Sequence, residues 1–405
     1  NKVSDRYENL KLIQKSFLQC YFDFPDTKKS FSELIGDQDY NFTRYNFFLA
    51  NYLLFKGKKE EAKKIITAAR KDNNTNLLLE QSEKFILDKN EKKIKNFFNC
   101  KRPQDNIAEI FYIIASLYSS EKEYRISNFY LKISNFINNN FTTNKTLLAE
   151  NFFYQGKYNE SKKIYKSIKL IGPVYSWHAS KRIAMILSKQ QGEKYSPSDL
   201  EKEFKLLVNP NFQDYYELAN FYKNRNYFKE SINYYTLALE NIDKDHLLIS
   251  KILDRRGTSY ERIDDWKNAE KDLKDSLKIS PDDPHVLNYL AYSWVEKKIN
   301  LDEALKMLKK ANSLKRNDGY ITDSLGWAYF AKSNYIEAEK YLQKAVELMP
   351  LDPVINDHYA DTLWMLKKNI QARYLWKHVL NLERTEKKLK EDIKKKLIYG
   401  VTKNL

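Results

Sequence analysis

The residue types that carry most enzyme chemistry are present in this chain, but without the spacing that catalysis or metal binding requires. The five histidines and two cysteines form no metal-ligand motif, and the nine glycines form no phosphate-binding loop. No Ser or Cys stands in the sharp-turn context of an activated nucleophile. We therefore expect no enzyme activity, no catalytic residue, no metal, no cofactor and no small-molecule substrate. The histidines are His178, His246, His285, His358 and His378.

Two carboxylate pairs could in principle serve as an acid and a base. Asp264-Asp265 and Asp282-Asp283 both fall where one helical pattern ends and the next begins. Aspartate at such a position accepts hydrogen bonds from the first free backbone amides of the following helix. Helix capping is therefore the favoured interpretation of both pairs.

The two cysteines, Cys20 and Cys100, lie 80 residues apart. A disulfide between them would have to join distant parts of the chain, so we expect two packed or exposed thiols. Cysteine usage alone does not identify the compartment.

The composition indicates which elements position these residues. Of the 405 residues, 42% are hydrophobic, and only nine are Gly and nine Pro. This content supports a continuous core and disfavours both a β-rich chain and a disordered one. No apolar stretch approaches the length of a membrane span, and no signal peptide is present.

The basic excess is unevenly distributed. Residues 1–200 carry 34 Lys and Arg against 22 Asp and Glu, residues 201–350 carry 24 against 25, and residues 351–405 carry 12 against 7. Most lysines alternate with glutamates, which favours solvated helix faces. Nucleic-acid binding by the basic N-terminal half is kept as the alternative function, and it would weaken steeply with salt.

Small residues recur with a constant step. Gly257, Ala291, Gly326 and Ala360 are separated by 34, 35 and 34 residues. A second small residue follows each after one helix length, namely Ala269, Ala304, Ala338 and Ala372. Small side chains at both points allow two helices to pack closely, so the period predicts successive helix pairs.

A step near 34 residues resembles the tetratricopeptide repeat, and weaker units extend the resemblance back to Ala50 and nearly over the whole chain. It implies an all-α fold, a right-handed α-solenoid of about eleven helix pairs. We expect a degenerate N-terminal array over 1–210, a well-formed array over 211–383 and a basic capping helix or tail over 384–405. An atypical first pair is expected from Tyr7 to Ile35.

The resemblance also implies a partner-binding groove along the first helices of the pairs. The family's groove positions, carried onto the three repeats from His285 onward, present large aromatic rings with polar groups beside them. Rings of this kind suit a peptide-binding hot spot, but they could equally pack between helices or against the tail as additional core. The expected groove residues are Asn288, Tyr292, Tyr320, Asp323, Trp327, Phe330, Asp357, Asp361 and Trp364.

Lysine and asparagine at groove positions could form a clamp for chaperone C-termini. Asn51, Asn220 and Lys223 hold such positions, but the lysines do not recur in consecutive repeats. Binding of chaperone tails is therefore not expected.

Residues 285–382 carry a more specific resemblance. The strings LNYLAYSWVEKKINLDEALKMLKKA, DGYITDSLGWAYFAKSNYIEAEKYLQKAVELMP and DPVINDHYADTLWMLKKNIQARYLWKHVL resemble proteobacterial envelope proteins. Some of these are outer-membrane lipoproteins that activate a carboxyl-terminal processing protease and deliver its substrates. The resemblance implies a non-enzymatic adaptor in the periplasm or cell envelope, with that protease or its substrates as partners.

The chain begins at Asn1 rather than Met. We expect either a removed leader or a truncation, so that membrane contact would come only through a lipid anchor outside this sequence. A cytoplasmic location is the alternative.

Overall fold

The computed structural model describes residues 2–36, 43–72, 76–192, 197–207 and 210–401, and these residues form twenty-three helices and no strand. The all-α fold expected from the sequence is confirmed. The chain divides into two compact units, residues 1–209 and residues 210–405, and each is described by itself.

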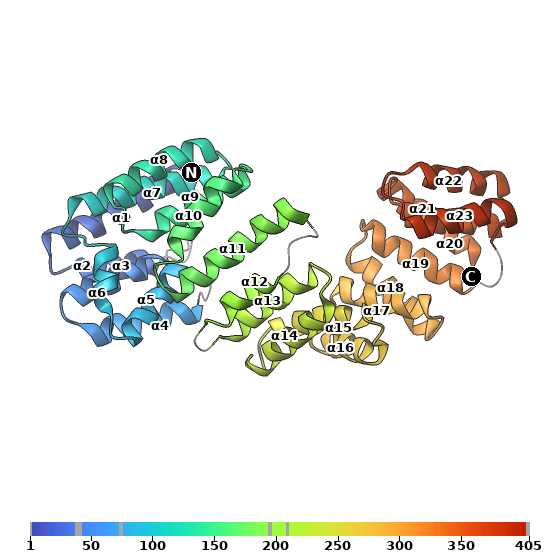
Figure 1. The fold of residues 1–405 in the computed structure, drawn as a ribbon, viewed down its shortest axis with the longest axis horizontal. Coiled ribbons are helices and arrows are strands. Elements are labelled where there is room, and N and C mark those ends of the chain that lie inside the picture. The colour runs from blue at the N-terminus through green and yellow to red at the C-terminus, as the bar shows by residue number, and fades with distance from the viewer. Residues whose placement is uncertain (1, 37–42, 73–75, 193–196, 208–209, 402–405) are drawn as a thin grey trace. The chain divides into compact units, whose positions relative to one another are not determined.

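The first unit contains twelve helices within its described residues, arranged as successive antiparallel pairs (Figure 1). Their bounds are α1 Lys2–Phe22, α2 Thr27–Ile35, α3 Tyr45–Phe55, α4 Lys59–Asp72, α5 Leu77–Leu87, α6 Glu91–Phe97, α7 Pro103–Ser120, α8 Tyr124–Ile137, α9 Thr142–Tyr154, α10 Tyr158–Ile168, α11 Pro173–Gln191 and α12 Ser198–Phe204. The pair α1 and α2 occupies the expected atypical first repeat. Part of the long turn expected between α11 and α12 lies outside the described residues.

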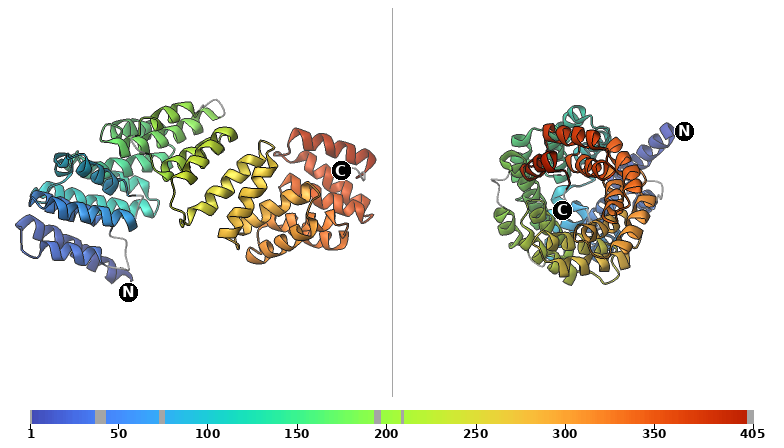
Figure 2. Two further views of the ribbon diagram at one scale, coloured as in Figure 1. Left: turned by 90° about the horizontal axis from the view of Figure 1, so that it is seen from below. Right: turned by 90° about the vertical axis from the view of Figure 1, so that its right-hand side faces the viewer.

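The second unit contains five further pairs and one additional helix, and Figure 2 presents the same succession from two other directions. The bounds are α13 Phe212–Lys223, α14 Phe228–Glu240, α15 Leu248–Glu261, α16 Trp266–Ile279, α17 Pro284–Glu296, α18 Leu301–Leu314, α19 Gly319–Ala331, α20 Tyr335–Leu348, α21 Pro353–Met365, α22 Asn369–Asn381 and α23 Lys387–Tyr399. The described helices thus make eleven pairs followed by α23. We call the first helix of each pair the A helix and the second the B helix.

Each turn between an A helix and its B helix contains a residue with positive φ, usually two positions before the B helix begins. Glycine fills this position at Gly57 and Gly156, whereas Lys122, Ser333 and others adopt the left-handed conformation despite their Cβ. The turn before α18 has two such residues, Lys298 and Asn300, which accounts for the extra residue noted there in the sequence. The backbone therefore repeats the period independently of the side chains.

Close packing of A and B helices explains the small residues. At Gly326 in α19, an added Cβ would lie 2.6 Å from Cγ of Leu342 in α20. At Gly257 in α15, it would lie 3.2 Å from the carbonyl oxygen of Ala269 in α16. A larger side chain at either point would push the helix axes apart.

Capping by aspartate is confirmed at the expected turns. The carboxylate of Asp283 accepts hydrogen bonds from the backbone amides of His285 and Val286, and Asp265 accepts one from Asn268. Asp352 caps α21 with Pro353 in the first turn. These carboxylates stabilise helix N-termini, where free amides and the helix dipole favour negative charge.

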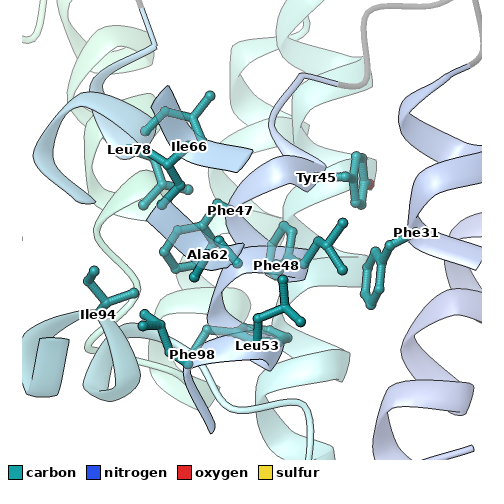
Figure 3. Close-up of a cluster of buried hydrophobic side chains, with 14 of the residues drawn as sticks. Phe31, Tyr45, Phe47, Phe48, Leu53, Ala62, Ile66, Leu78, Ile94 and Phe98 are labelled. Carbon is teal, nitrogen blue, oxygen red and sulfur yellow. The ribbon is translucent and has the colours of Figure 1, made fainter. Parts of the chain in front are cut away.

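The first unit has an aromatic core centred on α3 (Figure 3). Phe48 of α3 packs edge-on against Phe98, with ring centroids 4.7 Å apart, and against Phe17 of α1 at 5.0 Å. Phe47 contacts Phe141 from the opposite side at 6.0 Å. The core therefore joins α1, α3 and the segments after α6 and before α9.

The same arrangement corrects the expectation of two free thiols. Cys20 of α1 and Cys100, in the turn before α7, form a disulfide with their Cα atoms 5.8 Å apart. Because α3 packs against both the first pair and α6, residues 80 positions apart become neighbours. Sequence separation was therefore a poor measure of distance here.

The last helix, α23, packs against α21 and α22. Its Ile393 is fully buried in a cluster with Trp376 and Val379 of α22 and Leu363 of α21. No helix in the described ranges is both long and apolar enough to cross a bilayer.

Candidate functional site

The predicted aromatic residues of α19 form an internal stack. Trp327 lies between Phe330, with ring centroids 4.4 Å apart, and His358 of α21 at 4.0 Å, and all three rings are nearly parallel. The indole Nε1 of Trp327 donates a hydrogen bond to Glu296 of α17 at 2.7 Å. Trp327 and Phe330 remain half-buried, so part of each ring faces outward.

An ion pair lies behind this stack. Asp323 is buried, and its carboxylate lies 3.0 Å from Nδ1 of His358. Burial alone would lower the pKa of His358, but Asp323, with Asp357 and Asp361 nearby, raises it above its ordinary value. The expectation that Asp323 is open to a partner is wrong, because the next A helix already pairs with it.

Asp357 and Asp361 are likewise not open to a partner, which corrects their assignment to the groove. Lys396 of α23 reaches both carboxylates, with Nζ 2.7 Å from each, and all three side chains are buried. Asp361 also accepts a hydrogen bond from Nε1 of Trp376 at 3.0 Å. Burial and the Asp357 carboxylate raise the pKa of Asp361 to about 7, against the opposing effect of Lys396.

Trp364 belongs to the same internal cluster. Its ring packs against Trp376 with centroids 5.4 Å apart, and Gly400 lies so close that an added Cβ would overlap the indole. The guanidinium of Arg373 lies 5.4 Å from the ring centroid. Of the two interpretations left open for Trp364, packing against the tail helix is the one found.

Three predicted groove residues keep a larger open surface or an unsatisfied group. Tyr320 is 55% exposed, and Tyr292 is half-buried. Asn288 is half-buried too, and its Oδ1 is covered without a hydrogen-bond partner among the described residues. The predicted surface is therefore discontinuous, with its acidic members used internally.

An open groove lies instead on the preceding A helices of the second unit. It encloses a cavity of about 860 Å³, a size typical of ligand-binding clefts. We call it the A-helix groove, and its lining residues are Lys223, Asn224, Asn226 and Phe228 after and within α13 and α14, Asp254, Thr258 and Arg262 along α15 and its end, and His285 and Tyr289 of α17.

Two charged side chains dominate the electrostatics of the A-helix groove. Burial lowers the pKa of Lys223, with Arg255 and Arg262 adding to the effect and Asp254 opposing it. Burial raises the pKa of Asp254, opposed chiefly by Lys223. Each charge is therefore incompletely compensated, which is typical of binding positions.

Sequence reasoning identified only part of this groove. Lys223 and His285 were recognised at groove positions, but Lys223 was set aside because the lysine does not recur from repeat to repeat. Asp254, Thr258 and Arg262 were not considered. The same A-helix positions counted upstream from Ala291 would have found them, since Gly257 marks that repeat.

Comparison with known families agrees with the period. Models of the tetratricopeptide repeat match residues 215–245, which include α13 and α14, and residues 320–349, which include α19 and α20. This chain contains tetratricopeptide repeats. Such repeats bind other proteins and are typically non-enzymatic, so the chain is a scaffold for protein–protein interaction.

A TPR repeat-containing protein of Pseudomonas aeruginosa is 31% identical over 99 residues, which is 24% of this chain and 17% of that protein. The aligned region thus spans about one sixth of that relative's length.

Among solved structures, a tetratricopeptide repeat protein from Parabacteroides merdae has a TM-score of 0.45 and 19% identity, over 54% of this chain and 86% of that one. The C-terminal part of a TPR repeat-containing protein from Cytophaga hutchinsonii gives 0.42 and 17%, over 60% and 97%. Pseudomonas aeruginosa pilF gives 0.39 and 18%, over 45% and 83%.

No group of three or more His, Cys, Asp or Glu side chains in the described part of the chain is arranged to hold a metal ion.

Proposed function

We propose that this chain is an adaptor of the bacterial cell envelope that holds a segment of a partner protein in the A-helix groove. The observation that carries the proposal is the 860 Å³ cavity formed by three consecutive A helices. It offers charged groups, side-chain amides and the rings of Phe228 and Tyr289 on one surface. A segment bound there would bury apolar area and find partners for its polar groups.

The disulfide supports a location outside the cytoplasm. Cys20 and Cys100 are both buried and joined to each other, and such bonds persist in oxidising compartments such as the periplasm. The resemblance of residues 285–382 to envelope adaptors points in the same direction. We therefore place the protein in the periplasm, where an anchor on the mature chain would hold it at the outer membrane.

The same resemblance suggests the partner. A carboxyl-terminal processing protease, or a substrate that the protease cleaves, would occupy the groove or the exposed surface around Tyr320. In this role the chain would raise the local concentration of substrate near the protease, without chemistry of its own.

Site-specific photocrosslinking tests the proposal. A photoreactive amino acid replaces Asn224, which lines the groove, and in a second variant replaces Ile370, which is 87% exposed on α22 outside the groove. After illumination of intact cells, we expect the Asn224 variant alone to capture a processing protease or its substrate. Mass spectrometry of the crosslinked species identifies the partner.

The outcome that contradicts the proposal is equally defined. Identical crosslinked species from both positions would mean that the groove is not the binding site. Crosslinks confined to cytoplasmic proteins would contradict the envelope location, as would free Cys20 and Cys100 thiols in protein taken directly from cells.

A further inference from the structure

The two buried charges of the A-helix groove lack partners within the protein. Lys223 ends α13 and Asp254 lies on the neighbouring A helix, α15, and neither makes a hydrogen bond or a salt bridge with any described residue. Other half-buried charges nearby are paired. Arg255 donates to Asn220 at 2.8 Å, and Arg256 contacts both carboxylate oxygens of Asp272.

A buried charge without a partner is unfavourable unless a ligand supplies the opposite charge. Lys223 and Asp254 line the same cavity, so one ligand can contact both. The exposed Arg262 strengthens the positive side of the groove, and its one salt bridge, to Glu261, is long at 3.7 Å.

This arrangement discriminates between ligand charges. A purely acidic segment would suit Lys223 and Arg262 but would place carboxylates near Asp254. A purely basic segment would suit Asp254 but would meet Lys223 and Arg262. A segment with both charges satisfies each group without creating a like-charge contact.

We infer that the A-helix groove recognises a peptide segment carrying an acidic and a basic side chain together, the acid against Lys223 and Arg262 and the base against Asp254. The inference rests on the proposed function, because it assumes that the groove binds a protein segment. Asn224 and Asn226, which also line the cavity, supply uncharged groups for the backbone of that segment.

Selection from a phage-displayed library of random dodecapeptides tests the inference with the full chain as bait. Peptides enriched on the wild type should carry an acid and a base at a fixed separation. With Lys223→Gln, enrichment of the acid should fall about tenfold while the base is retained. With Asp254→Asn, the base should be lost and the acid retained.

Matched controls separate charge recognition from damage to the fold. Lys229→Gln and Asp245→Asn change exposed residues of the same unit outside the cavity and should leave the selected peptides unchanged. The double exchange Lys223→Glu/Asp254→Lys should reverse the order of the charges in the selected peptides. Thermal melts verify that each variant is folded.

Failure of the inference is distinguishable from failure of the proposed function. Enriched peptides without paired charges, or with charges indifferent to both substitutions, would overturn the inference, while specific Asn224 crosslinks would leave the groove as the binding site. Absence of any enriched peptide would also overturn it. Absence of groove crosslinks would instead overturn the proposed function.

Discussion

Lys396 determines the chemistry of the last repeat. It places one ammonium between two buried carboxylates, Asp357 and Asp361, at distances of 2.7 Å. The raised pKa of Asp361 and the raised pKa of Lys396 have one cause, because two carboxylates in an apolar cluster share one cation. At this scale, residues that resemble a binding surface in sequence serve to attach α23.

Removing the cation should therefore be costly. Lys396→Met leaves two buried carboxylates without a partner, and we expect it to destabilise the second unit by about 3–5 kcal/mol at pH 8. The loss should be smaller at pH 5, where Asp361 takes up a proton. Thermal melts at both pH values measure the effect, with the exposed Lys395→Met as the control. Equal stability of the two variants would mean that the ion pair does not hold α23.

His358 should make the stability of the second unit depend on pH. Its pKa is raised above the ordinary value of about 6.5, so its protonated form stabilises the fold below that pH. The contribution is lost as the pH rises through the raised pKa, and ionisation of Asp361 around pH 7 acts in the same direction. We expect the midpoint of thermal unfolding to fall by several degrees between pH 6 and pH 9.

The matched variant for this prediction is His358→Gln, which keeps a polar side chain but cannot be protonated. Its melting midpoint should change much less over the same range. A wild-type midpoint that rises with pH would contradict the assigned direction of the shift.

At the scale of the elements, the A–B turns repeat one backbone conformation. A left-handed residue closes each turn, and the chain uses glycine there at only some of the repeats. Residues with a Cβ pay a steric penalty in this conformation, so each such turn is less stable than its geometry permits.

Lys122→Gly should accordingly stabilise the protein by about 0.5–1 kcal/mol, because the exposed Lys122 has a φ of 64° and hydrogen-bonds only through its backbone. Lys132→Gly, at an exposed position within α8, should destabilise it by about 1 kcal/mol. Chemical denaturation compares the two variants. A loss of stability in Lys122→Gly would indicate that the lysine side chain contributes more than the turn strain removes.

At the scale of the whole molecule, the chain consists of two units with separate cores, and only the first contains a disulfide. The bond restricts the unfolded chain over 80 residues and ties the first repeat to the turn before α7. Its effect should therefore be confined to one half of the molecule.

Cys20→Ser/Cys100→Ser should lower the stability of the first unit by about 2–4 kcal/mol. Hydrogen exchange resolved along the sequence should show faster exchange in α1 to α6 and no change in α17 to α22. A reducing agent should destabilise the wild type but not the variant. Equal exchange in the variant and the oxidised wild type would mean that the bond does not contribute to stability.

The sequence by itself determined the helices, their pairing and their number. Small residues at Gly257 and Gly326, and caps at Asp283 and Asp352, act within one repeat, so their spacing carries the information. The site was only partly predictable, because A-helix positions can be counted but their occupancy cannot.

The tertiary structure alone decided three points. It joined Cys20 to Cys100, it brought Lys396 to carboxylates 35 and 39 residues away, and it left Lys223 and Asp254 open instead of Asp357 and Asp361. The physical reason is the same in each case. Which charge or thiol finds a partner depends on what a neighbouring repeat places against it, and no local pattern records that contact.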